Sequence, residues 1–497
     1  MAMTKPSDAS APLYRKAKEV WLVWILCAFS AVHVLVFSAA FPFFNSVDEP
    51  YHFDLVVKYS HLHFPRQQEY FSDESLQYIA IFCTWEYLYT YDTLPAPPWK
   101  LPPSAVTPVL LSRENHWRFA NYESEQPPLY YLVTGAWWRL GGAMGFHDAF
   151  LLYLLRFFNV LVVGALVWLG WLATRLVFPE KIFMRIALAA LVAFLPQSIF
   201  YSINNDVFSP LCFGAAFFCL LKLSRADALS LPLAIATGLA LAAAFLAKTS
   251  NLPLLAIAGC FILLRAWQWF KAGQLRGSAS ALFVLCLCAF LPMAAWMLWC
   301  KACFGSFLGS AKLAQQLGWT LKPFSEWWSH PLFTLHGFLV FLSGNLATFW
   351  QGELLWHGQP LSLLAANRLY PIISVVVIGT GLLFFKKTDP TQKHALFMAL
   401  AATLAVFAFY GFLSIIYDFH DCAYPSRAHP YFTSGRLLLG ALLPFLFLFT
   451  FGLDHLLQKL GTPGKFITLT CLVLAMLATE LATDLPAFSS QYNWYNM

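Results

Sequence analysis

Charged side chains are scarce in this sequence. Aspartate, glutamate, lysine and arginine make up only 11% of its 497 residues, whereas an average soluble protein carries about 25%. Hydrophobic residues make up 59% of the chain and aromatic residues 18%. This balance excludes an ordinary soluble globular protein. The net charge of +6 does not argue for nucleic-acid binding, because the basic residues are placed as a membrane topology requires.

Several common functional signatures are also missing. The eleven cysteines are scattered, and most of them lie in apolar stretches, without the spacing of a metal site or of a disulfide framework. The chain has neither a phosphate-loop motif nor a dinucleotide fingerprint. Its two halves show no clear internal repeat, a pattern that many transporters have. These absences disfavour a soluble nucleotide substrate and weaken the case for a transporter.

Long apolar stretches are what the sequence has instead. Runs of roughly 20 residues have the length needed to cross the hydrocarbon core of a membrane. The sequence therefore predicts an all-α polytopic membrane protein with about eleven transmembrane helices. The expected spans lie near 21–43, 149–174, 186–203, 207–224, 231–247, 251–266, 280–300, 366–385, 394–417, 435–456 and 466–484.

The basic residues give this scheme an orientation. They gather in the N-terminal segment and in the short turns on one side, whereas acidic residues prevail in the long loops of the other side. Loops enriched in Lys and Arg are cytoplasmic, so the long loops are expected outside. The first span is too long for a signal-peptide core and is predicted to be a retained anchor. If the apolar stretch 332–350 crossed, every later loop would invert, so we predict a re-entrant or interfacial helix there.

Two large extracytoplasmic segments are predicted, 44–148 and 301–365. The expected organisation is a cytoplasmic N-terminus (1–20), a transmembrane module (21–300) that includes the first segment, the second segment, and C-terminal transmembrane helices (366–497).

An acidic pair follows the first span directly. Asp48 and Glu49 precede Pro50, and His52 comes two residues later. Acidic groups at a membrane boundary are costly unless they are solvated or paired, so they are usually functional. A solvated loop start, with Pro50 ending the preceding structure, would explain an isolated acidic pair about as well.

Further polar residues share the expected extracytoplasmic side, and this convergence is more specific than any single motif. Glu125 and Gln126 close the first segment, Asn205 and Asp206 follow the third span, Lys248 follows the fifth, Trp350 and Glu353 end the second segment, and Arg436 opens the tenth span.

These motifs resemble the GT-C superfamily of multi-pass glycosyltransferases that use polyprenyl-phosphate sugars. The resemblance rests on the acidic pair, on Pro127-Pro128-Leu129-Tyr130-Tyr131, on the Asn-Asp after the third span and on the turn with Lys248. The chain looks closest to an uncharacterised bacterial branch with an Asp-Glu-Pro-x-His motif. It departs from that branch late in the chain, where Leu437 stands in place of an aromatic residue after Arg436.

The resemblance implies a reaction at the outer face of a bacterial cytoplasmic membrane, within cell-envelope glycan biosynthesis. A sugar would pass from a polyprenyl-phosphate donor to a hydroxyl of a glycan, lipid or protein, with inversion at the anomeric carbon. Asp48 is the candidate general base, with Glu49 or His52 positioning groups beside it. Arg436 and Lys248 are the candidate phosphate-binding residues. Asp206, Asn205, Glu125, Gln126, Trp350 and Glu353 would position donor and acceptor.

Alternatives remain beside these roles. His52 could be a hydrogen-bonded interface histidine, and Lys248 and Arg436 could snorkel to the interface. Asp206 could orient the donor, bind a divalent cation or cap a helix. Arg156 lies inside the second span, where a structural ion pair is expected. For the whole protein, the competing hypothesis is a transporter or lipid flippase.

Overall fold

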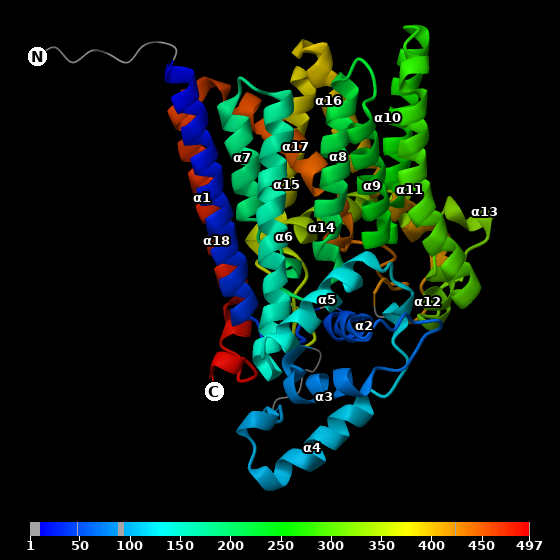
Figure 1. Ribbon diagram of the computed structural model, residues 1–497. Helices are drawn as coiled ribbons and strands as arrows, with labels where there is room; N and C mark the ends of the chain where they lie inside the picture. The colour runs from blue at the N-terminus through cyan, green and yellow to red at the C-terminus, as the bar shows by residue number, and fades with distance from the viewer. Residues whose placement is uncertain (1–9, 47, 88–93, 423, 497) are drawn as a thin grey trace, which may run out of the picture.

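The computed structural model describes residues 10–46, 48–87, 94–422 and 424–496, and it is helical almost throughout (Figure 1). A bundle of long apolar helices forms most of it. Its members are α1 (Ser10–Ala40), α6 (Asp148–Val177), α7 (Ile182–Ala193), α8 (Ser209–Arg225), α9 (Leu231–Ala247), α10 (Leu252–Lys271), α11 (Leu275–Phe304), α15 (Leu364–Phe384), α16 (Pro390–Ile416), α17 (Leu442–Leu456) and α18 (Gly461–Phe488).

The prediction of an all-α polytopic membrane protein is confirmed. Within the described ranges, nine helices are long and apolar enough to cross a membrane. The spans expected near 186–203 and 231–247 fall on α7 and α9, which have only 12 and 17 residues. Each of these two helices is followed by an irregular stretch that contains a 3-10 turn, Ser198–Tyr201 after α7 and Thr249–Asn251 after α9. The structure therefore does not confirm the count of eleven spans.

A cap of shorter helices covers one end of the bundle. In Figure 1, α3 and α4 lie furthest from the bundle, below α2 and α5. The cap contains α2 (Glu49–Ser60), α3 (Asp73–Phe82), α4 (Pro103–His116), α5 (Leu129–Ala143), α12 (Ser310–Gln316), α13 (Phe324–Trp327) and α14 (Leu335–Gln351).

Two-residue strands and 3-10 turns complete the described structure. Strand β1 (Thr320–Leu321) pairs antiparallel with β4 (Tyr417–Asp418), and β2 (Leu355–Trp356) with β3 (Gln359–Pro360). The 3-10 turns are η1 (Trp85–Tyr87), η2 (Pro98–Lys100), η3 (Tyr122–Glu125), η4 (Ser198–Tyr201), η5 (Asn205–Val207), η6 (Thr249–Asn251), η7 (Pro331–Phe333), η8 (Phe385–Lys387), η9 (Gly435–Ala441), η10 (Gln458–Leu460) and η11 (Trp494–Asn496).

Helix α14 occupies the stretch for which a re-entrant or interfacial helix was expected. Just before it, the Lys322 N–H donates to the carbonyl of Ile416, the last residue of α16. At its end, Gln351 donates to the Asn367 side chain, in the first turn of α15. The chain that leads to α14, at Lys322, and the last residue of α14 are thus attached to the same end of the bundle. This arrangement fits a helix that returns to the face from which it entered.

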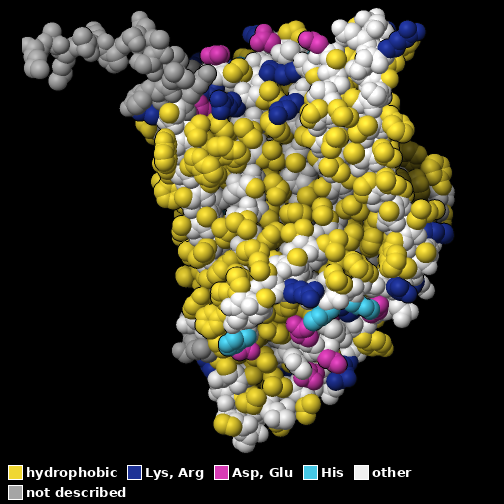
Figure 2. Space-filling view, viewed as in Figure 1, with side chains coloured by type: hydrophobic (Ala, Val, Ile, Leu, Met, Phe, Trp, Pro, Cys, Tyr) yellow, Lys and Arg dark blue, Asp and Glu magenta, His cyan; other side chains and the backbone are white. Residues whose placement is uncertain are grey.

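The surface of the bundle is a broad hydrophobic belt. Figure 2 shows this belt between two ends where charged side chains of both signs appear, and on this face the His side chains lie at the capped end. Helix α17 lies at the centre of the bundle, and all of its residues from Leu442 to Asp454 are buried. Small residues allow close packing of backbones in apolar helices. At Gly238 of α9, for example, a Cβ would lie 2.5 Å from the Leu285 carbonyl oxygen of α11.

A polar cluster lies inside the bundle, between helices that are otherwise apolar. His33 of α1 contacts the Glu480 carboxylate of α18 at 2.9 Å. The Tyr201 hydroxyl also donates to this carboxylate, and the His33 ring lies 3.2 Å from the Ala193 carbonyl at the end of α7. The cluster therefore joins four segments of the bundle by mutually satisfied polar groups.

Candidate active site

The carboxylates of Asp48 and Glu49 point into different environments. Asp48 precedes α2 and has a left-handed backbone, with φ 63°, and Pro50 lies in the first helical turn. An aspartate tolerates this conformation better than most residues, and proline is favoured at a helix start. The turn at Asp48 separates two side chains that are adjacent in the sequence.

Asp48 lies at the boundary of an ion-pair cluster. One of its oxygens accepts a hydrogen bond from the Arg436 guanidinium at 2.7 Å, and the other accepts one from the Tyr122 hydroxyl at 2.5 Å. Burial favours a raised pKa for Asp48, but Arg436, together with His52 and the hydroxyl of Tyr122, holds the pKa below its ordinary value. The carboxylate is therefore ionised at neutral pH.

Arg436 connects three carboxylates from different parts of the chain. Besides Asp48, its guanidinium lies 3.3 Å from Asp206 and 3.6 Å from Glu353. The Ser434 hydroxyl holds Glu353 at 2.6 Å. The backbone that carries Arg436 is fixed by direct packing of Gly435 on the backbone of Phe349, where no side chain would fit. A planar guanidinium with several acceptors has few alternative positions.

Lys248 brings a second cation to the cluster. Its ammonium group contacts Asp206, whose own N–H donates to the Asn204 side chain at 2.9 Å. Burial, followed by the nearby charge of Arg436, lowers the pKa of Lys248 to about 7. Lys248 follows the last residue of α9 directly, so it reaches the cluster from the end of a bundle helix.

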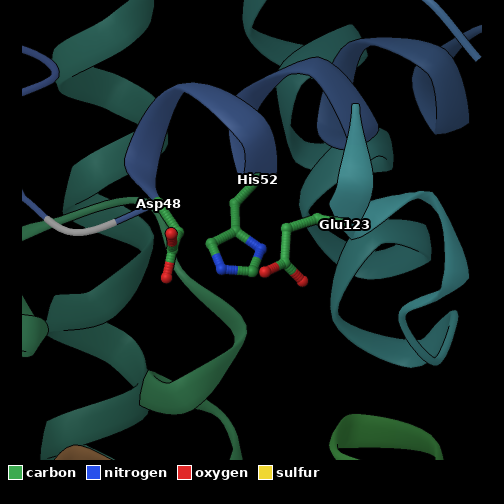
Figure 3. A group of neighbouring side chains, drawn as sticks. All are labelled: Asp48, His52 and Glu123. Carbon is green, nitrogen blue, oxygen red and sulfur yellow. The ribbon is translucent and has the colours of Figure 1, made fainter. Parts of the chain in front are cut away.

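A second group of side chains meets the ion-pair cluster at Asp48 (Figure 3). Asp48, His52 and Glu123 each offer one atom that could bind a metal ion, and these three atoms lie within 4.8 Å of one another. Figure 3 shows the three side chains converging from the start of α2 and from η3. Burial lowers the pKa of His52 to about 3, so this ring is neutral. Burial and the Asp48 charge raise the pKa of Glu123 to about 7. The Tyr131 hydroxyl lies 2.7 Å from the Nδ1 of His52.

The structure brings together most of the residues expected at the site. Asp48, His52, Asp206, Lys248, Glu353 and Arg436 belong to the two groups described above. Asn205 and Gln126 lie at their edge, where the Asn205 amide donates to Gln126 at 3.0 Å and Gln126 donates to Glu123 at 2.5 Å.

Glu49 was expected to position groups beside Asp48, but its side chain lies elsewhere. It is fully buried and forms a bidentate pair with Arg156 of α6, at 2.9 and 2.8 Å. It also accepts the backbone N–H of Ile203 at 3.0 Å. The pair that the sequence indicated for Arg156 is thus present, and Glu49 is its partner. Glu49 therefore ties the cap to the bundle and does not face the cluster.

We expect Glu49→Ala to destabilise the protein, because it leaves the Arg156 charge buried without its partner. Breaking a buried ion pair typically costs about 3–5 kcal/mol. Thermal unfolding of the purified protein would measure the loss. The double variant Glu49→Met/Arg156→Met, which removes both charges, should recover much of it. Normal stability with lost activity would instead return Glu49 to the site.

Two other expected residues lie away from the cluster. Trp350 is buried, donates to the Ser374 hydroxyl at 2.8 Å and stacks on Tyr370, so it packs α14 against α15. Glu125 lies on the far side of η3, against Gly309, and burial raises its pKa to about 7. The tight turn of η3 directs Glu123, and not Glu125, toward Asp48.

Glu123, Tyr122 and Tyr131 were missed as site residues by the sequence analysis. Gln126 follows Glu123 by three residues, a spacing that lets the two side chains meet in a turn, and this was the available signal for Glu123. The tyrosines carry no such signal, since aromatic residues abound throughout the chain.

Solved structures with similarity to the chain are forms of the oligosaccharyltransferase of the archaeon Archaeoglobus fulgidus. The apo form has 11% identity and a TM-score of 0.41, over 94% of this chain and 56% of that one. The AglB complex with an inhibitory peptide and a dolichol-phosphate has 11% identity and a TM-score of 0.42, over 97% and 56%. The form tethered to an acceptor peptide with the NVT sequon has 12% identity and a TM-score of 0.40, over 94% and 55%. This chain spans little more than half the length of these proteins.

No curated protein matches the chain. A family described as "Predicted membrane protein (DUF2142)" matches residues 32–415, which include most of the bundle, the cap and every site residue except Arg436. The chain therefore belongs to this family of predicted membrane proteins, DUF2142.

Proposed function

We propose that the protein is a GT-C-type membrane glycosyltransferase, which transfers a sugar from a polyprenyl-phosphate donor to an acceptor hydroxyl. The observation that carries the proposal is the contact between Asp48 and Arg436, at the capped end of the bundle. An ionised carboxylate can accept the proton of an attacking hydroxyl. A guanidinium beside it can bind the phosphate that leaves.

Arg436 and Lys248 are the donor-binding residues in this proposal. Arginine offers two parallel N–H groups to phosphate oxygens, and lysine adds a point charge. A lipid-linked phosphate reaches the site from the bilayer, and both residues adjoin bundle helices: Lys248 follows α9, and Arg436 precedes α17.

Phosphate binding would also change Asp48. The free enzyme holds Asp48 in an ion pair that lowers its pKa and hence its basicity. A donor phosphate would compete with Asp48 for the Arg436 guanidinium. The carboxylate released in this way is the stronger base, so donor binding prepares the proton acceptor.

The transfer is a single displacement. The acceptor oxygen attacks the anomeric carbon, its proton passes to Asp48, and the bond to the phosphate oxygen breaks with its electron pair on the phosphate. Attack opposite the leaving group inverts the anomeric centre. The acceptor is a glycan, lipid or protein hydroxyl.

The proposed setting is a bacterial cytoplasmic membrane, with the active site on the outer side. The support is the position of the cluster at the capped end of the bundle, opposite the short basic turns that follow α6, α8, α10 and α15. Basic loops remain in the cytoplasm, and the cap is then extracytoplasmic, within the pathway of cell-envelope glycan synthesis.

A divalent cation is a further part of the proposal. Asp48, His52 and Glu123 offer two carboxylates and a neutral imidazole within 4.8 Å, a ligand set that fits such an ion. Together with Asp48 and Glu123, the adjoining Asp206 and Glu353 place four acidic side chains beside two basic ones, Arg436 and Lys248. A bound cation would supply positive charge next to the incoming phosphate.

Chelation tests the cation. We expect EDTA treatment of the purified protein to lower its affinity for the lipid donor, and Mg²⁺ or Mn²⁺ to restore it. Glu123→Gln should weaken binding of Mn²⁺, measured by its electron paramagnetic resonance spectrum without donor. If EDTA changes neither donor affinity nor turnover, the site needs no divalent cation. Protonation of its carboxyl groups would then offset their negative charge.

The proposed function is tested in liposomes that contain the purified protein and a radiolabelled polyprenyl-phosphate sugar. The proposal predicts release of polyprenyl phosphate and labelled product in the presence of an acceptor extract. Movement of the intact donor between leaflets without consumption would contradict it. That result would establish the lipid flippase alternative instead.

A further inference from the structure

A cavity of about 170 Å³ adjoins Asp48 on the side of the cap. Drug-sized ligands occupy pockets of about 300–1,000 Å³, so this cavity accommodates a group about the size of one ring. Asp48 is the lining residue that also belongs to the ion-pair cluster. The cavity is therefore continuous with the site through the carboxylate that is the candidate base.

The two carboxylate oxygens of Asp48 accept hydrogen bonds from two different parts of the site. Arg436, a residue of the cluster, binds one oxygen, and Tyr122, a residue of the cavity wall, binds the other. The phosphate-binding cations thus stand on one flank of the carboxylate and the cavity on the other. A nucleophile in the cavity and a leaving phosphate at Arg436 would be placed on different sides of the transferred sugar.

The walls of the cavity are aromatic faces. The rings of Tyr51 and Tyr122 are tilted by 38° with centroids 4.1 Å apart, and Trp117 meets Tyr51 edge-on at 5.8 Å. Phe44 and Trp85 complete the aromatic part of the lining. These rings also pack against one another, which holds the shape of the wall without a ligand.

Polar groups lie among these rings. Ser46, Thr84 and His116 line the same cavity as Asp48. A purely apolar ligand would cover these hydrogen-bonding side chains without replacing the water around them, which is unfavourable. A pyranose ring matches both features, because its C–H faces pack on aromatic rings and its hydroxyls reach polar side chains.

The cavity belongs to the extracytoplasmic cap. Its lining residues come from 44–51, 83–85 and 116–122, which flank α2, α3 and α4. The bundle helices that would admit a lipid tail instead adjoin Lys248 and Arg436. A ligand enters this cavity from the water side of the cap, whereas the donor enters from the membrane side.

We propose that this aromatic cavity is the acceptor subsite and that the acceptor is a sugar residue of a glycan. The inference rests on the proposed function and narrows its acceptor to one class. The acceptor hydroxyl would lie at Asp48, lose its proton to that carboxylate and form the new glycosidic bond as the sugar–phosphate bond breaks.

Binding without donor gives the first test. The probes are methyl glycosides of glucose, galactose, mannose and N-acetylglucosamine, measured by saturation-transfer NMR and by quenching of tryptophan fluorescence. We expect saturable binding of at least one glycoside to the wild type. Tyr51→Ala, which removes part of the wall, and Ser46→Leu, which fills the cavity, should each weaken it by about tenfold or more.

Tyr70→Ala is the matched control, because Tyr70 is an exposed aromatic residue of the same cap outside the cavity. It should bind glycosides like the wild type. Donor affinity reports on folding in all variants and should be unchanged in Ser46→Leu. If no glycoside binds to the wild type, or if both cavity variants bind like the control, the acceptor proposal is wrong.

The acceptor KM separates this proposal from the proposed function. Both cavity variants should raise the KM for a glycan acceptor and leave the donor KM unchanged. Normal donor use with an unchanged acceptor KM in both variants would overturn the cavity proposal alone. Absence of donor use by the wild type would overturn the proposed function, whatever the glycoside measurements give.

Discussion

Asp48→Asn is expected to reduce sugar transfer by at least about 10²-fold, within the 10²–10⁴-fold range typical of a lost general base. Asparagine has the shape of aspartate but cannot take the proton of the acceptor. The initial rate with a saturating radiolabelled polyprenyl-phosphate sugar measures the effect. The fold should persist, because Arg436 retains Asp206 and Glu353 as partners.

Asp73→Asn provides the matched control for that experiment. Asp73 is an exposed carboxylate in the first turn of α3, in the same cap but outside the cluster. Its activity should equal that of the wild type. A wild-type rate in Asp48→Asn would remove Asp48 as the base and, with it, the mechanism proposed for this site.

Arg436→Ala is expected to raise the donor KM by about 10–100-fold, which corresponds to the roughly 1.5–3 kcal/mol of a hydrogen bond to a charged group. Turnover should also fall, because the charge that grows on the leaving phosphate loses its partner. Arg436→Lys keeps the charge but not the two parallel N–H groups, so its donor KM should lie between those of Arg436→Ala and the wild type.

Arg427→Ala controls for the loss of a cation from the same side of the protein. Arg427 pairs with Asp418 at 2.8 Å, and its side chain is 62% exposed. Its removal should leave both kinetic parameters unchanged. If Arg436→Ala behaves like Arg427→Ala, Arg436 is an interface anchor and does not bind the donor.

Hydropathy predicted the all-α membrane architecture well, because each spanning helix must bury its backbone polar groups along an apolar length. Helices α7 and α9 are shorter than a membrane span. Helix α7 ends at Ala193, before η4, and α9 ends at Ala247, directly before Lys248. Hydropathy averages over such a turn, since its residues are still partly apolar. The length of a helix next to a site is therefore harder to predict than its existence.

The sequence predicted that the polar residues of the site meet at one end of the bundle, but it did not predict the direction of their side chains. Asp48 and Glu49 are adjacent, yet one left-handed residue sends their carboxylates to Arg436 and to Arg156. Glu123 and Glu125 are separated by one residue, and the 3-10 turn decides which one faces Asp48. These directions follow from backbone geometry that residue types alone do not specify.

The intramembrane contact between His33 and Glu480 was not predictable for another reason. The two residues are 447 positions apart, and the sequence of neither helix alone points to a partner in the other. Their pairing depends on which helices become neighbours in the bundle. Only the packing of α1 beside α18, visible in Figure 1, brings them together.

The central claim is that the donor is a lipid-linked sugar phosphate bound beside Asp48 and Arg436. The most direct measurement supplies the same labelled sugar to the purified protein either as a polyprenyl-phosphate ester or as a soluble nucleotide ester. We predict transfer from the lipid ester alone, and its loss in Asp48→Asn. Transfer from the nucleotide ester, or equal turnover of the lipid ester by wild type and Asp48→Asn, would contradict the claim.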